Sequence, residues 1–530
     1  MKRRLPWPVL VCLFAACAQV RDPQGGPKDE QPPILKEAAP PSGSTGFAGD
    51  RIILHFNERV TLDRVREKLF ISPPLAKAPD VSVVHGTDVV IALNAPLLPN
   101  TTYTFNIGDA IADLSEGNHA LGLNYVLATG DHVDSLAVVG RVEDALSGQA
   151  ATGVLVLLHD ASDTTTVRTG MPAYFTRTDA DGHFVLSHLR EGRFHLTALR
   201  DQNANYLYDL PNEDIAFTDH IVGSGDTLPQ HPALFREPPV DQQLMEARVL
   251  PDRGWRLVLA RPGGALGLRS LDREGGSLRW LPEWNATRDT VVLWPSDTTL
   301  LPEQRFELRE AAIVLDTITY RPVTKMPFYV ALTLGTDTML DVHTLVASRP
   351  LSAVDTSRIH FHRGAATVPL TALLDTAAPR MLRLIDPSKG MDKGDLELLP
   401  GAVKDLIGAS NDTVRLAIGA TSASLFGELH VAVRTDSSSE TLGATVLQLL
   451  DATGRVSREF RGTSWPLRVD WRNVPPGAYS LRLIEDRDGN GRWSTGSFRE
   501  GRQPERTLRY SAPVNVRAGW TVEITWIVLP

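Results

Sequence analysis

Oxygen-bearing side chains alternate along one short stretch near the C-terminus, at a spacing that suits a hard metal ion. Asp486, Asp488 and Asn490 stand at every second position, and Gly491 follows them directly. Calcium loops open in this way, because alternate oxygens converge on the ion while glycine permits a sharp turn. The twelfth position is Ser497 instead of a bidentate glutamate, and no helical pattern flanks the loop, which excludes an EF-hand. Two interpretations stay open: a calcium site, or a long β-hairpin whose Asx turns satisfy local backbone N–H groups.

The same pattern occurs in the first half of the chain. The segment from Gly192 to Asn205 aligns without a gap with the segment from Gly477 to Asn490, at a constant offset of 285 residues. Both contain a glycine, an aromatic residue, alternating apolar residues and a polar triplet. Tyr206 takes the glycine position in this copy. The same two interpretations, calcium or hairpin, apply to its oxygen donors, and the missing glycine makes the match to a calcium loop weaker here. The donors are Asp201, Asn203, Asn205 and Asp209.

A tripeptide of Asp, then Ser or Thr, then an apolar residue or Thr recurs along the chain. It resembles the O-glycosylation sequon that some Gram-negative bacteria use on exported proteins, and a glycan there would add solvated mass at strand ends. The other interpretation is a turn that ends on Asp before a strand that begins on Thr. The candidate hydroxyls are those of Ser135, Thr164, Thr227, Thr290, Thr298, Thr317, Thr338, Thr376 and Thr413.

Motifs of catalytic centres are missing from the sequence. It contains no G-x-S-x-G, H-E-x-x-H, G-x-x-x-x-G-K or G-x-G-x-x-G pattern. His360 and His362 lie two residues apart on an expected strand, so they share a face, as a pair of zinc ligands would. Because no third ligand can be identified, an exposed polar face is the preferred interpretation. The sequence therefore predicts a protein without enzymatic activity.

The N-terminus predicts export and attachment to a membrane. Basic residues at positions 2–4 precede an apolar run from Leu5 to Phe14, which is too short to cross a bilayer as a helix. Ala15 and Ala16 then precede Cys17, a sequence that resembles the bacterial lipobox. The resemblance implies cleavage before Cys17 and acyl chains on that residue. The other cysteine, Cys12, would leave with the signal peptide, which excludes disulfides and cysteine-based zinc sites.

Composition predicts an all-β chain of several domains. The 37 prolines and 41 glycines are dispersed between short alternating runs of Val, Ile, Leu and Thr, as many strands joined by turns require. No long stretch has the 3.6-residue periodicity of a helix. A length of 530 residues exceeds that of a single small domain. The net charge of −9, spread without basic clusters, argues against nucleic acid as a partner.

Two kinds of module are suggested by resemblance. Phe56-Asn57-Glu58, Leu98 to Tyr103 and Ala110 to Asp113 resemble the SbsA-type bacterial Ig-like domain. Strand patterns around Asp181-Gly182, and the Gly192 segment, resemble prealbumin-like or carboxypeptidase-regulatory-like β-sandwiches. Ala110 to Leu114 is echoed at Ala402 to Leu406. The expected order is signal peptide 1–16, flexible tether 17–33, SbsA-type Ig-like domain 34–133, prealbumin-like sandwich 134–236, sandwich of uncertain type 237–340, second Ig-like domain 341–434 and second prealbumin-like sandwich 435–530.

Together these features predict a lipid-anchored envelope protein, with the outer membrane of a Gram-negative bacterium as its location. Its expected role is that of a structural, adhesive or partner-binding scaffold for an envelope protein or glycan. One alternative is a carbohydrate-binding subunit of a nutrient-uptake system, which needs an aromatic platform; the nearest candidates are Trp465, Trp471 and Trp493. The other alternative is a hydrolase in the middle region.

Overall fold

A computed structural model describes ten stretches of the chain: residues 29–163, 166–272, 279–296, 303–322, 329–334, 342–375, 378–385, 393–418, 423–436 and 442–528. The predicted signal peptide, Cys17, most of the tether, and Thr164, Thr298, Thr338 and Thr376 lie outside these residues. The chain is almost entirely β, with 51% in strands and 2% in helix, which confirms the predicted fold class. None of the helices in the described residues is long and apolar enough to span a membrane.

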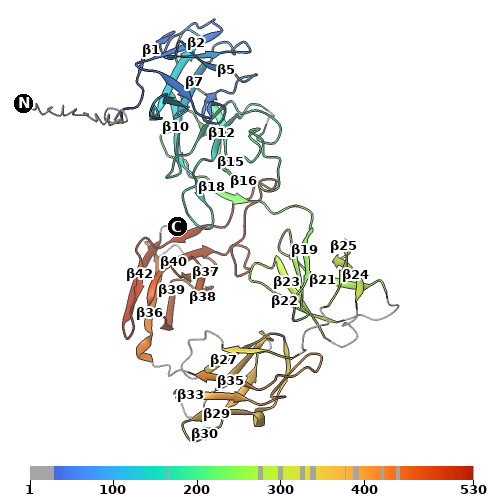
Figure 1. The fold of residues 1–530 in the computed structure, drawn as a ribbon. Helices are drawn as coiled ribbons and strands as arrows, with labels where there is room; N and C mark the ends of the chain where they lie inside the picture. The colour runs from blue at the N-terminus through green and yellow to red at the C-terminus, as the bar shows by residue number, and fades with distance from the viewer. Residues whose placement is uncertain are drawn as a thin grey trace, which may run out of the picture. The chain divides into compact units, whose positions relative to one another are not determined.

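The described chain divides into two compact units. The first contains the residues up to Ala137 together with Ala173–Thr176 and Leu186–Gly192, and the second contains the rest. Strand pairing defines five β-modules within them, which we number in chain order as modules 1 to 5 and which occupy residues 35–128, 136–236, 244–320, 332–418 and 427–528. Figure 1 labels some of the strands of each module.

Module 1 has three small antiparallel sheets, with orders β1-β2-β6-β5, β4-β7-β9 and β3-β8. Alternation along the strands buries one face of each, and Leu54, Phe105 and Tyr125 are fully buried in the shared core. The elements are β1 (Leu35–Ala39), β2 (Arg51–Phe56), β3 (Val60–Leu62), α1 (Val65–Lys68), β4 (Phe70–Ser72), β5 (Asp80–Val84), β6 (Asp88–Ala92), β7 (Thr102–Gly108), β8 (Ile111–Asp113) and β9 (Leu123–Ala128).

Module 4 repeats this strand order. Its sheets run β26-β27-β32-β31, β28-β34 and β30-β29-β33-β35, so that only β30 has no counterpart in module 1. The strands are β26 (Leu332–Leu334), β27 (Val342–Ala347), β28 (Leu351–Val354), β29 (Ile359–Arg363), β30 (Ala366–Val368), β31 (Thr371–Leu374), β32 (Met381–Ile385), β33 (Gly394–Leu398), β34 (Val403–Asp405) and β35 (Val414–Ile418), with a 3-10 turn at Thr356–Arg358.

The sequence echo between modules 1 and 4 falls on equivalent strands. Asp113 ends β8 and Asp405 ends β34, and each carboxylate accepts backbone N–H groups of the turn that follows. In module 4, Arg349 also donates to Asp405 at 2.7 Å, and both side chains are buried. The echo therefore marks a shared loop in which a carboxylate closes the turn after the second strand of a two-stranded sheet.

Module 3 is a sandwich of one four-stranded and one three-stranded sheet, β19-β20-β23-β22 and β21-β24-β25. Its core is aromatic, with the Trp255 ring 5.7 Å from Phe306 and 5.4 Å from Tyr320. The strands are β19 (Leu244–Val249), β20 (Trp255–Leu259), β21 (Leu266–Ser270), β22 (Trp280–Trp284), β23 (Thr290–Pro295), β24 (Gln304–Glu310) and β25 (Ile313–Tyr320).

Module 2 is built around one large sheet with the order β11-β18-β16-β15-β12-β13, in which β17 also pairs with β15, and a smaller pair, β10-β14. The strands are β10 (Leu136–Arg141), β11 (Glu143–Asp144), β12 (Leu155–Asp160), β13 (Tyr174–Arg177), β14 (His183–Leu189), β15 (Arg193–Arg200), β16 (Asp214–Phe217), β17 (Val222–Gly223) and β18 (Ala233–Arg236).

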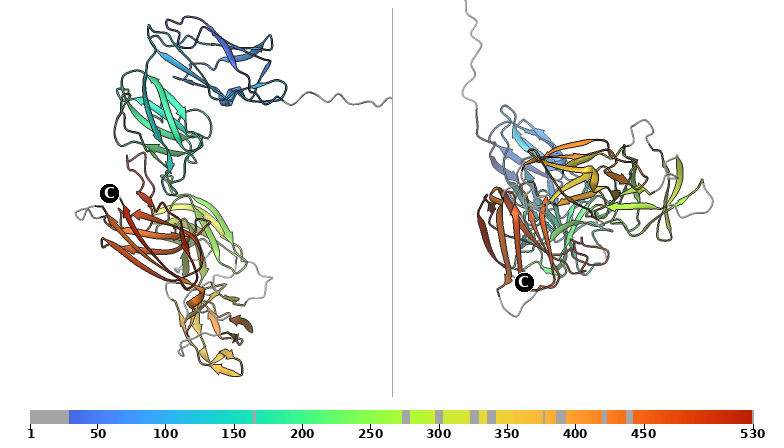
Figure 2. Two further views of the ribbon diagram at one scale, coloured as in Figure 1. Left: turned by 90° about the vertical axis from the view of Figure 1, so that its left-hand side faces the viewer. Right: turned by 90° about the horizontal axis from the view of Figure 1, so that it is seen from below.

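Module 5 has two sheets, β39-β36-β43 and β38-β37-β40-β41, and β42 also pairs with β40. The long strands of the first sheet pair side by side, and the colours of Figure 2 run from orange at β36 to red at β43. The strands are β36 (Gly427–Thr435), β37 (Thr445–Leu450), β38 (Val456–Gly462), β39 (Leu467–Val474), β40 (Gly477–Glu485), β41 (Thr507–Arg509), β42 (Val514–Val516) and β43 (Thr521–Val528), and a 3-10 turn lies at Ala423–Leu425.

Two strands fall on the other side of the module boundaries expected from sequence. The boundary at 341 cuts β26 from module 4, and the boundary at 435 cuts β36 from module 5. β36 belongs with module 5 because its alternating Leu429, Val431 and Val433 are buried in the core that β39 and β43 complete. Pairing across the sheet, instead of local composition, decides where these modules begin.

Modules 2 and 5 have matching central strands. β15 pairs with β12, β16 and β17, just as β40 pairs with β37, β41 and β42. One charged pair is inverted between the copies: Arg200 contacts Asp214 at 3.1 Å in module 2, whereas Glu485 contacts Arg506 at 3.3 Å in module 5. The polar loops predicted as cation sites therefore occupy the same place in both modules, between β15 and β16 and between β40 and β41.

Candidate metal site and docking segment

The polar loop of module 5 begins at the end of β40, where Asp486 is buried with 6% of its surface exposed. Its backbone N–H donates to the carbonyl of Ala444, and its Oδ2 accepts the N–H of Gly491 at 2.9 Å. Gly489 and Gly491 have φ angles of 71° and 73°, in the left-handed region that glycine adopts without a Cβ clash. The glycines therefore let the chain fold back over the Asp486 carboxylate.

Asp488 is exposed, but one of its carboxylate oxygens lies within 4.8 Å of oxygens of Asp486 and Glu505. Its Oδ1 accepts the Asn490 N–H at 3.0 Å, and its Oδ2 accepts the Asn490 amide at 2.7 Å and the Ser494 hydroxyl at 2.6 Å. Partial burial acts to raise the pKa of Asp488, but the Ser494 and Asn490 donors outweigh it and the pKa is lowered. Asn490 turns its amide nitrogen toward Asp488, and its own oxygen accepts the Arg492 N–H. Of the predicted triplet, the two aspartates bring carboxylate oxygens close together, and the asparagine donates a hydrogen bond to Asp488.

Glu505 completes the cluster, and the sequence analysis missed it. The side chain is 5% exposed, and it accepts the N–H groups of Arg487 and Ser494, each at 2.8 Å. Burial raises its pKa, and the nearby charge of Asp488 adds to the effect. One oxygen from each of Asp486, Asp488 and Glu505 lies within 4.8 Å of the others, and in the described part of the chain this is the one such group of His, Cys, Asp or Glu side chains.

The loop of module 2 has the same backbone path but a different interior. Ala204 and Tyr206 adopt φ angles of 58° and 64° at the positions of Gly489 and Gly491. Glu213, fully buried, accepts the N–H groups of Gln202, Asp209 and Leu210, as Glu505 does in module 5. The two glutamates are therefore equivalent, although their offset is 292 residues instead of 285.

The aspartate carboxylates of the module 2 loop accept hydrogen bonds from groups of the same loop. Asp201 accepts the backbone N–H groups of Asn203, Ala204 and Tyr206. The side-chain amides of Asn203 and Asn205 donate to the two oxygens of Asp209, at 3.2 and 2.8 Å. The predicted donors Asp201, Asn203, Asn205 and Asp209 thus lie in one loop but bind one another, and no group of three carboxylates converges there.

The change of offset locates seven additional residues in module 5, Thr495–Gly501, which we call the docking segment. It packs on module 2. The Phe498 ring lies 5.4 Å from Phe217 and 5.9 Å from Tyr208, in edge-to-face geometry. Gly496 lies so close to Phe235 that a Cβ would stand 2.6 Å from the ring. The extra residues therefore form a contact that the module 2 loop cannot make.

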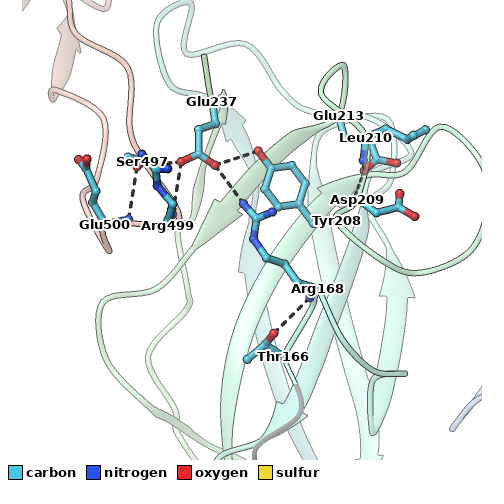
Figure 3. Close-up of polar contacts among 10 residues, drawn as sticks. All are labelled: Thr166, Arg168, Tyr208, Asp209, Leu210, Glu213, Glu237, Ser497, Arg499 and Glu500. Atoms are coloured by element: carbon cyan, nitrogen blue, oxygen red, sulfur yellow. Dashed lines mark hydrogen bonds and ion pairs between the residues drawn. The ribbon is translucent and has the colours of Figure 1, made fainter. Parts of the chain in front are cut away.

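Polar contacts surround the Phe498 ring, and Figure 3 shows their centre at Glu237. One oxygen of Glu237 accepts the Ser497 hydroxyl at 2.8 Å, and the other contacts the Tyr208 hydroxyl at 3.2 Å and the Arg168 guanidinium at 3.3 Å. The Arg168 guanidinium also lies 4.6 Å from the centre of the Tyr208 ring. Burial, followed by the Glu237 charge, raises the pKa of Tyr208 far above its usual range. Ser497, the twelfth loop position, therefore serves the module junction.

Further hydrogen bonds join the two modules on either side of the docking segment. Thr495 donates to the carbonyl of Arg236 at 2.9 Å, and Gln503 donates to that of Phe217 at 2.8 Å. At the start of β41, Thr507 donates to the carbonyl of Ala145 at 2.7 Å. Modules 2 and 5 are thus in direct contact although modules 3 and 4 separate them in sequence.

The histidine pair lies on β29 as predicted, with ring centroids 6.2 Å apart. β33 pairs alongside and sets Glu397 opposite His360 and Asp395 opposite His362. Arg415 donates to Glu397 at 2.8 Å, and Thr367 contacts His362 at 3.2 Å. Within the described residues no third ligand gathers with the two histidines, so a zinc site receives no support from the geometry.

The three tryptophans considered as a carbohydrate platform do not form one. Trp471 is buried in the core of module 5, and Trp465 packs against that core. Trp493 is half-buried, and its indole N–H donates to the carbonyl of Glu505 at 3.0 Å. These residues therefore form no exposed platform: Trp471 is turned inward by alternation along β39, Trp465 packs on the core just before that strand, and the loop holds Trp493.

Among the predicted glycosylation sites in the described chain, Ser135, Thr227, Thr317 and Thr413 are exposed. Thr290 is half-buried and its hydroxyl donates to Asp289 at 3.0 Å. Thr290 begins β23, as the turn-and-strand interpretation expects, whereas Thr317 lies inside β25. Exposure therefore permits modification at four of these sites.

Comparisons with known proteins support the first module. Residues 29–128 match the Big_5 family model, described as a bacterial Ig-like domain, which confirms a bacterial Ig-like domain at the N-terminal end. None of the curated proteins matches the chain significantly.

Solved structures with similar features include three proteins that differ widely. The BcpA major pilin subunit of Bacillus cereus shares 12% identity over 74% of this chain and 98% of its own, with a TM-score of 0.14. The S-layer protein rSbsC shares 10% over 85% and 65%, with a TM-score of 0.14. The glucan utilization locus protein SGBP-B of Bacteroides ovatus shares 12% over 72% and 94%, with a TM-score of 0.19. At scores this low, none of them informs on function.

Proposed function

We propose that this chain is a non-enzymatic scaffold of the bacterial envelope, anchored through acyl chains on Cys17, that binds an envelope protein or glycan through its β-modules. The junction between modules 2 and 5 is the observation that carries the proposal. There, Phe498 and Ser497 engage module 2 through aromatic and charge-assisted contacts. A junction of this kind fixes the spacing of modules, which suits a protein that presents loops on a rigid frame.

The buried acidic and aromatic groups of this region are used for structure. Glu213 and Glu505 accept backbone N–H groups, and Glu237 contacts a tyrosine, an arginine and a serine. Groups of these types would serve acid–base chemistry if they lined an open cleft. Here they close loops and join modules, which favours a scaffold over a hydrolase.

The proposed location depends on the N-terminal sequence. Each acyl methylene buried in lipid contributes about 0.8 kcal/mol, so several chains on Cys17 would hold the protein on a membrane. We extend the proposal to the outer membrane of a Gram-negative bacterium and to O-glycosylation of the exposed hydroxyls at Ser135, Thr227, Thr317 and Thr413.

Detergent partitioning of cell fractions tests the anchor. The full chain should enter the detergent phase, and Cys17→Ala should remain in the aqueous phase. Recovery of Cys17→Ala in the detergent phase would contradict acylation at this residue.

A pull-down from envelope extracts, paired with a peptidase and glycosidase screen of the purified chain, tests the scaffold. We expect capture of a partner and no turnover. Turnover that disappears in His360→Ala or His362→Ala would overturn the proposal in favour of a hydrolase.

A further inference from the structure

One buried carboxylate oxygen in module 5 has no hydrogen-bond partner. Asp486 Oδ1 is shielded from solvent and receives no donor, while its companion Oδ2 accepts the Gly491 N–H. Leaving a buried charged oxygen unsatisfied is costly, since the group has lost its water without replacement. An orphaned oxygen beside two other carboxylates therefore requires a donor or a cation.

The equivalent oxygen in module 2 is satisfied. Asp201 Oδ1 accepts the N–H groups of Asn203 and Ala204 at 3.1 and 2.7 Å. In module 5 the N–H of Asp488, the counterpart of Asn203, is directed to Glu505 instead, at 3.4 Å. One of the two donors to this oxygen in module 2 thus has a counterpart in module 5 that donates to Glu505 instead.

Nearby cationic side chains do not neutralise the cluster. The guanidinium groups of Arg487 and Arg506 contact Glu485, at 3.4 and 3.3 Å, outside the group of three. Asp486, Asp488 and Glu505 place oxygens within 4.8 Å of one another, close enough for a single ion to contact all three after small adjustments. Three carboxylates this close to one another suit a hard divalent cation.

We propose that Asp486, Asp488 and Glu505 bind one calcium ion, and that the bound ion fixes the docking segment of module 5 on module 2. Calcium accepts several oxygen ligands in flexible geometry. The three carboxylates of this loop can supply such ligands. Magnesium demands a stricter octahedron and keeps its water, so it fits this loop less well.

The coupling to the docking segment follows from the positions of the ligands. Asp486 and Asp488 precede Thr495–Gly501, and Glu505 follows it, so the ion would close the base of the segment. Ser494, at its start, donates its hydroxyl to Asp488 and its N–H to Glu505. Calcium therefore orders the two ends between which Phe498 is held against Phe217.

Terbium luminescence and calorimetry on the purified full chain test the site. Terbium substitutes for calcium, and the Trp493 indole, bonded to the Glu505 carbonyl, lies where it can sensitise the ion. We expect one terbium or calcium ion per chain, displacement of terbium by calcium, and much weaker binding of magnesium. Absence of binding at millimolar calcium, or equal affinity for magnesium, would overturn the assignment.

Matched substitutions in the two loops locate the ion. Asp486→Asn and Glu505→Gln should each weaken calcium binding by about tenfold or more, because each removes a ligand charge. Asp209→Asn, in the module 2 loop, should leave binding unchanged. The thermal midpoints measured in chelator show whether the variants are folded. Undiminished binding by folded Asp486→Asn, or loss of binding in Asp209→Asn, would contradict the site.

Hydrogen exchange tests the coupling separately. Calcium should slow exchange of the docking segment in the wild-type chain and leave it unaltered in Asp486→Asn. Calcium binding without a change in exchange at residues 495–501 would refute the link between ion and junction. A failure of this kind concerns the loop alone, and the envelope scaffold is judged by its own partitioning and pull-down experiments.

Discussion

The loops that follow β15 in module 2 and β40 in module 5 share one sequence pattern, but the side chains inside them are arranged differently. In module 2, backbone and side-chain amides occupy the carboxylates of Asp201 and Asp209. In module 5, three carboxylates converge and one oxygen stays unpartnered. The module 5 loop is also longer by the docking segment, which reaches back to module 2. A shared motif thus fixed the backbone path, while substitutions and added residues determined what each loop can bind.

Removal of the docking segment should make the module 5 loop as long as the module 2 loop. Among these changes it should have the largest effect on the stability of the junction. Deletion of Thr495–Gly501 gives module 5 a loop of the module 2 length, and it removes the Phe498, Thr495 and Ser497 contacts at once. We expect modules 2 and 5 to unfold in separate transitions. Calorimetry of the full chain measures this, and transitions identical to those of the wild type would contradict a stabilising junction.

Phe498→Ala keeps the length of the loop and removes its aromatic anchor. Because the ring packs against Phe217 and Tyr208, we expect a loss of about 3 kcal/mol at the junction. Denaturant unfolding measures the change. Phe460→Ala is the matched control, since Phe460 is an exposed phenylalanine of β38 in the same module, and an equal loss in both variants would count against specific docking.

Tyr208→Phe tests the module 2 side of the junction. Removal of the hydroxyl that contacts Glu237 should cost about 1 kcal/mol. The pKa of Tyr208 is raised in the folded chain. The Tyr208 hydroxyl therefore contributes its full share of folding stability below its pKa in the unfolded chain, about 10, and this contribution is lost as the pH rises above that value. The difference in unfolding free energy between the wild type and Tyr208→Phe should therefore vanish at high pH. A constant difference across an alkaline titration would argue against this contact.

Substitutions at the two equivalent residues with left-handed backbone conformation, Gly489 and Ala204, should have the smallest effect on the unfolding free energy. A Cβ at Gly489 meets open space, so Gly489→Ala pays only for its positive φ, about 1 kcal/mol. Ala204→Gly, at the equivalent position, should stabilise module 2 by less than that, because glycine also gains freedom in the unfolded chain. Equal and same-signed changes in unfolding free energy would show that the two backbones are not equivalent.

Much of the architecture could be predicted because alternation and repetition are local signals. The register shared by β15 and β40 placed both loops correctly, and the echo around Asp113 and Asp405 fell on equivalent strands. Glu505 could not be found in the same way, because the docking segment shifts it out of register with Glu213. A search that allowed a gap after Ser494 would have aligned the two glutamates. Packing also decided what local patterns could not: Trp471 is a core residue, and β36, expected in the second Ig-like domain, belongs to module 5.

The inverted charge pair of modules 2 and 5 disfavours the pairing of a strand of one module with the equivalent strand of the other during folding. Neighbouring copies of one fold in a single chain are prone to exchange equivalent strands. If β15 accepted β41 in place of β16, Arg200 would face Arg506; in the reciprocal exchange, Glu485 would face Asp214. Each correct pairing sets opposite charges together, and each exchanged pairing sets like charges together, which is unfavourable across adjacent strands. One reversed pair of side chains thus gives each module a means of recognising its own strand.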